Sequence, residues 1–166
     1  MWNTIVHTLR DEFSDLADPE QFTRVVARLV LAVALGACLG YEREQKGSTA
    51  GLRTHMLVAL GVALPVVAAT QSGFAPEDVS RVLQGILAGI GFLGAGAIIK
   101  QSENENVKGL TTAASIWATA AIAVAAGLGR EATAILATVI AVAILSLLLR
   151  LEQRAIPRSS KDGDSH

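Results

Sequence analysis

Two clusters of polar side chains are the places where this chain could do chemistry, and both lie where a charged loop meets an apolar stretch. The first cluster combines carboxylates, cations and a histidine: Glu42, Arg43, Glu44, Arg53 and His55. Such a set could bind an ion or a phosphate, or it could form a network of charges that locks two helices together. Glu42 and Glu44 are two positions apart and do not face the same way on a helix, which favours the locking network.

The second cluster is a cation followed by hydroxyl side chains: Lys108, Thr111, Thr112 and Ser115. If the segment is helical from Lys108 onward, these side chains project together with Thr119 within an arc of about 100°. The stripe could line a polar cavity, or its hydroxyls could bond their own backbone or a neighbouring helix, as they often do in lipid. Arg53 and Lys108 together could also form one cytoplasmic site for an anion or a lipid headgroup.

Neither cluster is typical of a catalytic or metal centre. The three histidines, His7, His55 and His166, have no Ser, Cys or carboxylate placed to form a nucleophile and its base. Magnesium prefers about six hard oxygen ligands, whereas the carboxylates here are scattered over loops without a fixed spacing. We therefore expect no catalytic residues, no metal site, no cofactor and no enzymatic activity.

The elements that must position these clusters are five apolar stretches. Of the 166 residues 51% are hydrophobic and 17% charged, whereas soluble domains usually carry about 25% charged residues. Charges are almost absent from five runs of about 17–19 residues, the length of one bilayer crossing: residues 25–41, 54–70, 82–99, 110–128 and 132–149. The runs lack the polar stripe of helices in a soluble bundle. We predict an all-α, polytopic membrane bundle with five transmembrane helices in the lipid bilayer.

The net charge of −1 provides no basic face for nucleic acid.

The glycines predict how the helices pack. Residues 83–99 hold five glycines and no charge, and small side chains let membrane helices approach one another closely. Because these glycines fall on two faces of a helix, we expect this segment to form the centre of the bundle and the protein to form a homo-oligomer. The predicted packing residues are Gly36, Gly40, Gly85, Gly89, Gly91, Gly94, Gly96 and Trp117.

Both ends of the chain are predicted to lie outside the bundle. Residues 1–21 carry apolar side chains at helical spacing opposite charged ones, so they form an amphipathic helix that lies on the membrane surface or docks on the bundle. Asp18 and Pro19 mark the start of the next helix, in which Arg28 is expected to extend to the headgroups. Residues 22–151 form the transmembrane domain, and residues 152–166 form a disordered cytoplasmic tail.

Lysine and arginine predict the orientation, because they concentrate on the cytoplasmic side of membrane proteins. With five crossings, nine of the 14 fall in the loops 42–53 and 100–109 and in the C-terminal tail. We therefore expect the N-terminus outside and the C-terminus in the cytoplasm, although Arg24 and Arg28 near the first crossing argue the other way.

Four motifs resemble, in order and spacing, the membrane domain of the MgtC/SapB family: Glu42-Arg43-Glu44, residues 51–55, residues 89–96, and residues 109–114 followed by Trp117. The resemblance covers residues 22–151. It implies a multi-pass protein of the bacterial inner membrane, linked in several members to growth at low magnesium, stress adaptation and virulence. Some members carry a folded cytoplasmic domain after the last crossing, which this chain is expected to lack.

Two functions remain open. The first is a non-enzymatic regulator that acts through helix–helix contacts with other membrane proteins, which small residues left facing lipid in the assembled bundle would support. The second is a channel or transporter for a cation, such as Mg²⁺, or for a small solute. The crossings contain no Asp or Glu at mid-depth, and conducting cations usually requires carboxylates or exposed carbonyls there. The regulator is therefore favoured.

Overall fold

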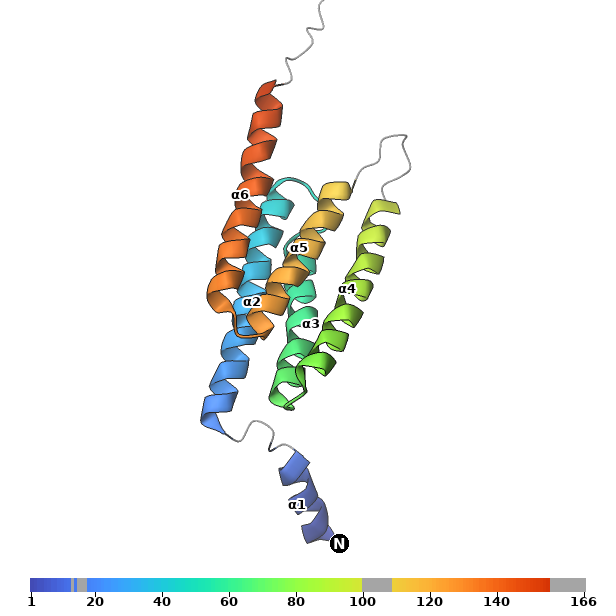
Figure 1. Ribbon diagram of the computed structural model, residues 1–166, viewed down its shortest axis with the longest axis vertical. Helices are drawn as coiled ribbons and strands as arrows, with labels where there is room; N and C mark the ends of the chain where they lie inside the picture. Colours follow the sequence, from blue (N-terminus) through green and yellow to red (C-terminus); the bar gives the residue numbers. More distant parts are fainter. Residues whose placement is uncertain (13, 15–17, 100–108, 156–166) are drawn as a thin grey trace, which may run out of the picture.

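The computed structural model describes residues 1–12, 14, 18–99 and 109–155, with the backbone alone at 99 and 148–155. In this part of the chain there are six helices and no strand: α1 (Trp2–Glu12), α2 (Pro19–Gln45), α3 (Leu52–Gln71), α4 (Pro76–Ile99), α5 (Leu110–Gly127) and α6 (Glu131–Ala155). Helices α2 to α6 run alternately up and down along one axis (Figure 1). The predicted all-α class is confirmed.

Four helices, α2 to α5, are long and apolar enough to cross a membrane. The predicted fifth crossing is α6, whose apolar part Glu131–Leu147 is shorter within the described side chains. Helix α6 packs against α5 and α2 and continues past Leu151, the predicted end of the transmembrane domain, to Ala155. Residues 156–166 of the predicted tail lie outside the described residues.

Helix α5 occupies the centre of the bundle. It packs against α2, α3, α4 and α6. Half of the residues in its apolar stretch are buried, compared with 6% of those in the apolar stretch of α4. Its buried alanines, Ala120, Ala123 and Ala126, fill the interior with methyl groups. Small residues on α5 therefore let four neighbours approach one helix.

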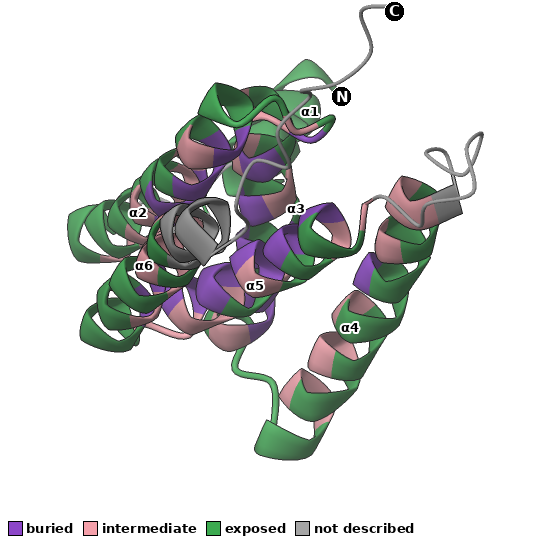
Figure 2. Ribbon diagram, turned by 90° about the horizontal axis from the view of Figure 1, so that it is seen from above, coloured by how far each residue is buried: buried purple, intermediate pink, exposed green. Residues whose placement is uncertain are grey.

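Helix α4, which holds the five glycines of residues 83–99, lies at the edge of the bundle, and the expectation that it forms the centre is wrong. Among the described helices it contacts α5 and α3 only, and most of its surface is exposed (Figure 2). A methyl group built on Gly94 would lie 3.7 Å from Ala113 Cβ, whereas one on each of the others would meet no atom within 4 Å: Gly85, Gly89, Gly91 and Gly96. Lipid is as apolar as the helix itself, so apolarity does not drive α4 inward.

The closest backbone approach joins α2 to α3, the pair that packs most extensively. A methyl group on Gly36 would lie 2.7 Å from the His55 carbonyl oxygen, and one on Gly40 would lie 2.7 Å from Leu52 Cα. Neither position has room for a side chain, because the obstructing atoms belong to the backbone. These two glycines set the distance between α2 and the first turns of α3.

The opposite end of α2 is fixed by two polar contacts. The Asp18 side chain accepts a hydrogen bond from the Glu20 amide at 3.2 Å, which confirms the predicted helix start. Arg28, expected to extend to the headgroups, donates from Nη1 to the Gly127 carbonyl oxygen at 3.3 Å. A cation at the carboxyl end of α5 is favourable because the last carbonyls have no partner in their own helix.

Helix α1 has no buried residue and makes no contact with another described helix. It lies beyond the end of the bundle at which α2 begins (Figure 1). The structure therefore does not show the second alternative for this amphipathic segment, in which it docks on the bundle.

Replacing Gly36 and Gly85 separately by alanine compares a glycine packed against a neighbouring backbone with one that faces outward. Gly36→Ala should lower the free energy of unfolding by about 1–3 kcal/mol, because the added methyl group overpacks against the α3 backbone. Gly85→Ala should be neutral or stabilising by up to about 1 kcal/mol, since alanine favours a helix more than glycine does. Thermal unfolding in detergent measures both, and an equal loss in the two variants would contradict the packing described.

Candidate functional site

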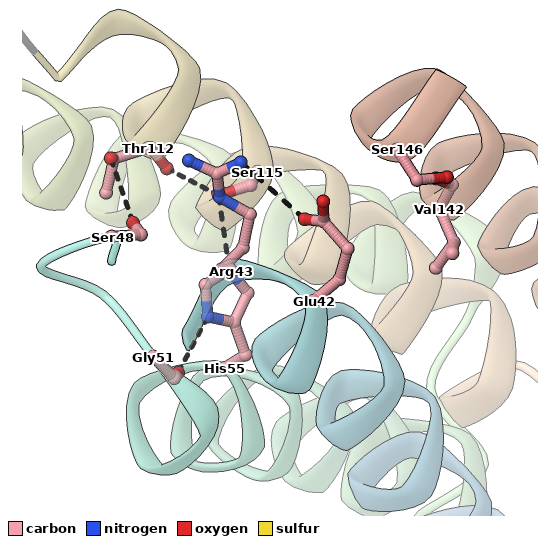
Figure 3. A network of polar contacts seen from close by, with 9 residues as sticks. All are labelled: Glu42, Arg43, Ser48, Gly51, His55, Thr112, Ser115, Val142 and Ser146. Carbon is pink, nitrogen blue, oxygen red and sulfur yellow. Dashed lines mark hydrogen bonds and ion pairs between the residues drawn. The ribbon is translucent and has the colours of Figure 1, made fainter. Parts of the chain in front are cut away.

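A polar network joins the α2–α3 loop, the first turn of α3 and the first turns of α5 (Figure 3). His55 lies at its centre and is 0% exposed. Its Nδ1 is 2.9 Å from the Gly51 carbonyl oxygen, and its Nε2 is 3.2 Å from Ser115 Oγ. Because a carbonyl only accepts, Nδ1 carries a hydrogen, and in neutral histidine Nε2 then accepts from the Ser115 hydroxyl.

The hydroxyls of α5 form bonds inside the chain. Ser115 Oγ also lies 2.8 Å from the Thr112 carbonyl oxygen, so its single hydrogen has two acceptors in reach. Thr119 donates to the Ser115 carbonyl oxygen at 2.9 Å. Thr112 Oγ1 is 3.1 Å from Ser48 Oγ. These bonds connect α5 to its own backbone, to α3 and to the loop.

The loop between α2 and α3 is held mainly by the last turn of α2. The Ser48 amide donates to the Arg43 carbonyl oxygen at 2.9 Å, and Gly47 has a φ of 69°, which a glycine adopts without steric cost. Gly51 begins α3 without a side-chain cap, and Glu44 Oε2 accepts from the Leu52 amide at 2.8 Å instead. A carboxylate there also faces the positive end of the helix dipole.

Glu42 and Arg43 form a second, incompletely satisfied pair beside this network. Arg43 Nη1 is 3.6 Å from Glu42 Oε2, and each side chain is 10% exposed. Both Glu42 carboxylate oxygens and Arg43 Nε are buried without a hydrogen-bond partner among the described residues. Buried polar atoms normally find partners, so this is the point in the described chain with unused binding capacity.

The structure brings only part of the predicted polar set together. Glu44, His55, Thr112 and Ser115 meet in the network, and Glu42 and Arg43 lie beside it. The side chains of Arg53 and Thr111 are exposed and form no hydrogen bond or ion pair with another described residue. Lys108 lies outside the described residues.

Ser48 belongs to the network but was absent from the predicted site, whereas Thr119 was predicted to share the hydroxyl stripe of this segment. The signal for Ser48 is its position in the short loop that joins two motif-bearing helices. Thr119 follows Ser115 by four residues, which places both side chains on one face of a helix. Within the described chain, no three His, Cys, Asp or Glu side chains are grouped so that they could hold a metal ion.

Comparison with known proteins identifies relatives over most of the chain. It is 42% identical to protein SrpB of Synechococcus elongatus over 144 residues, which are 80% of this chain and 79% of SrpB. It is 41% identical to protein MgtC of Salmonella typhimurium over 129 residues, 78% of this chain and 54% of that protein. It is 37% identical to the putative magnesium transporter YhiD of Escherichia coli over 142 residues, 81% of this chain and 65% of YhiD.

The chain thus spans about half the length of Salmonella MgtC and most of SrpB. No solved structure gives a significant match. A sequence model of the MgtC family matches residues 29–154, which include the glycine pair of α2, the polar network and all of α4. Together with the apolar helices α2 to α5, this match shows a bacterial membrane protein that belongs to the MgtC family.

Proposed function

We propose that this protein is a non-enzymatic membrane regulator that acts through lateral contact of α4 with another membrane protein. The observation that carries the proposal is the outward face of α4, where small residues are exposed on an apolar helix. The link to magnesium limitation and stress rests on the family, whose members include the putative magnesium transporter YhiD.

The outward face of α4 combines small residues with one large side chain: Gly85, Ala88, Ala95, Gly96 and Phe92, all exposed. Phe92 is 83% exposed and projects between the small residues on either side of it along the helix. An exposed glycine weakens a helix by about 1 kcal/mol relative to alanine. The fold of the single chain gains nothing from that cost, whereas a helix of a second protein could approach the bare backbone closely.

The polar network around His55, whose donors and acceptors bond to one another, also supports a regulator rather than a channel or transporter. Both ring nitrogens of His55 have partners, and the hydroxyls of Thr112, Ser115 and Thr119 are engaged inside the chain. A network that uses its own donors and acceptors holds α2, α3 and α5 in register and offers few groups to a passing ion. We assign to it a structural role.

The orientation follows from the charge distribution. The α2–α3 loop, the start of α5 and the end of α6 lie at one end of the bundle, away from α1 (Figure 1). If that end is cytoplasmic, as the lysines and arginines predict, the network lies on the cytoplasmic side and the N-terminus lies outside. Reporter fusions to the two termini test this, and activity of both in one compartment would contradict it.

The second candidate function is cation transport. It is favoured by the buried Glu42 carboxylate, whose oxygens lack hydrogen-bond partners in the described chain, and by the name of the relative YhiD. Glu42 lies near the end of α2, and among the described side chains it is close to one cation, Arg43. A single carboxylate paired with an arginine provides few of the oxygen ligands that Mg²⁺ requires.

Ser115→Ala and Thr111→Ala form a matched pair that tests the structural role of the network. Ser115→Ala leaves His55 Nε2 buried without a partner and should lower the free energy of unfolding by about 1–3 kcal/mol. Thr111→Ala removes an exposed hydroxyl without a bond in the described chain and should change stability by less than about 0.5 kcal/mol. Unfolding in detergent is the measurement, and an unchanged Ser115→Ala variant would show that the network does not lock the helices.

Gly85→Leu and Gly96→Leu on α4 test the regulator proposal. Each leucine would obstruct an approaching helix but meets no atom within 4 Å at its Cβ inside this chain, so membrane levels should remain normal. A deletion strain complemented with either variant should fail to grow at low magnesium. A photo-crosslinker at Phe92 should give one discrete product in native membranes, which both variants should abolish.

Ala68→Leu, on the exposed side of α3, is the control for this experiment and should retain growth and crosslinking. Mass spectrometry of the product distinguishes a second copy of this chain from a different protein. Normal growth and crosslinking of both glycine variants would refute the proposed role of α4.

A flux assay separates the two candidate functions. Liposomes containing the purified protein and a magnesium-sensitive dye should show no Mg²⁺ uptake above that of protein-free liposomes. Uptake that Glu42→Gln abolishes would establish the transporter and overturn the regulator.

A further inference from the structure

A lateral groove of about 530 Å³ lies between α3 and α4, within the range of roughly 300–1,000 Å³ that is usual for small-molecule sites. Its walls are aliphatic and come from both helices: Leu57, Val58, Val62, Ile86, Ile90 and Leu93. Gly61 and Gly89 also line it, and a methyl group on either would meet no atom within 4 Å. The missing side chains therefore leave space in the groove.

The groove opens toward the lipid. Leu57 and Leu93 are 68% and 49% exposed, so the rim is accessible from the side of the bundle. From Arg53 at one end to Val62 at the other, the α3 wall extends about 13–14 Å at 1.5 Å per residue. An extended hydrocarbon chain could lie along it.

One end of the groove has a different chemistry, because Arg53 and Thr54 line it there. Both belong to the first turn of α3, where amides have no preceding turn to bond. Gly51 provides no side-chain cap, and Glu44 satisfies the Leu52 amide alone. Arg53 itself is exposed and has no ion pair or hydrogen bond within the described chain.

The Arg53 guanidinium at this end of the groove matches the charge and the acceptor oxygens of a phosphate group. An aliphatic groove that continues from it matches a hydrocarbon chain. We propose that this groove binds one anionic phospholipid from the membrane, with its phosphate at Arg53 and one acyl chain between α3 and α4. A headgroup without an amine fits best, because Glu44 is occupied at the α3 N-terminus and Arg53 would repel a second cation.

Native mass spectrometry of the full chain tests this site. The protein is released from micelles that contain equal amounts of phosphatidylglycerol and phosphatidylcholine, and wild type should retain one phosphatidylglycerol in preference. Arg53→Gln should weaken its retention about tenfold, as expected for loss of a charge-assisted phosphate contact. Arg130→Gln removes an exposed arginine at the other end of the bundle and should have no effect.

Gly61→Leu tests the acyl chain separately, because it fills the groove and leaves Arg53 in place. It should also lower phosphatidylglycerol retention about tenfold, and Gly89→Leu from the opposite wall replaces it if thermal unfolding shows that Gly61→Leu does not fold. Inorganic phosphate at millimolar concentration should not displace the lipid. Displacement by phosphate, unchanged retention in the groove-filled variant, or equal retention of the two lipids would each overturn the proposal.

The outcome does not depend on the regulatory role. Gly85 and Gly96, which test that role, do not line the groove. Loss of lipid retention with intact partner crosslinking, or the reverse, would therefore separate the two proposals.

Discussion

The close approach of α2 to α3 at Gly36 and Gly40 is the constraint on which the rest of the structure depends. Any side chain at these positions would collide with the α3 backbone, so the two helices meet at a distance that few other residue pairs permit. That distance lets Glu44 reach the Leu52 amide and seals His55 between α2 and α5. The bond of Ser48 to Thr112 then joins the loop between these two helices to α5.

The helices of the bundle are consequently held by two different kinds of interaction. Directional hydrogen bonds connect α2, α3 and α5, and they specify one arrangement because buried partners cannot be exchanged without cost. Among the described residues no hydrogen bond or ion pair joins α4 to α5 or α3, and its contacts with them are apolar, such as that of Gly94 with Ala113. Dispersion forces between apolar surfaces are similar for protein and for lipid, so the outer surfaces of α4 remain available. The proposed protein contact and the proposed lipid site both use that helix.

Much of the fold could be predicted from the sequence, because five nearly uncharged runs and an Asp18-Pro19 start are local signals. The position of α4 could not, since a glycine pattern shows that a close neighbour is possible but not which chain provides it. The polar site was predicted in part. Arg53 and His55 share one motif, yet residues two apart on a helix face in different directions, and the structure places Arg53 on the groove and His55 in the interior. The bond from Ser48 to α5 depends on tertiary contact that no local pattern encodes.

The contact of Arg28 with the Gly127 carbonyl joins residues 99 positions apart and has a consequence for biogenesis. When α2 leaves the ribosome, its arginine has no such acceptor, because the end of α5 has yet to be synthesised. A charged side chain without a partner is costly inside a bilayer, so we expect the N-terminal end of α2 to stay at the aqueous boundary during early insertion. We therefore expect the first transmembrane helix to reach its final depth only after the end of α5 has been inserted.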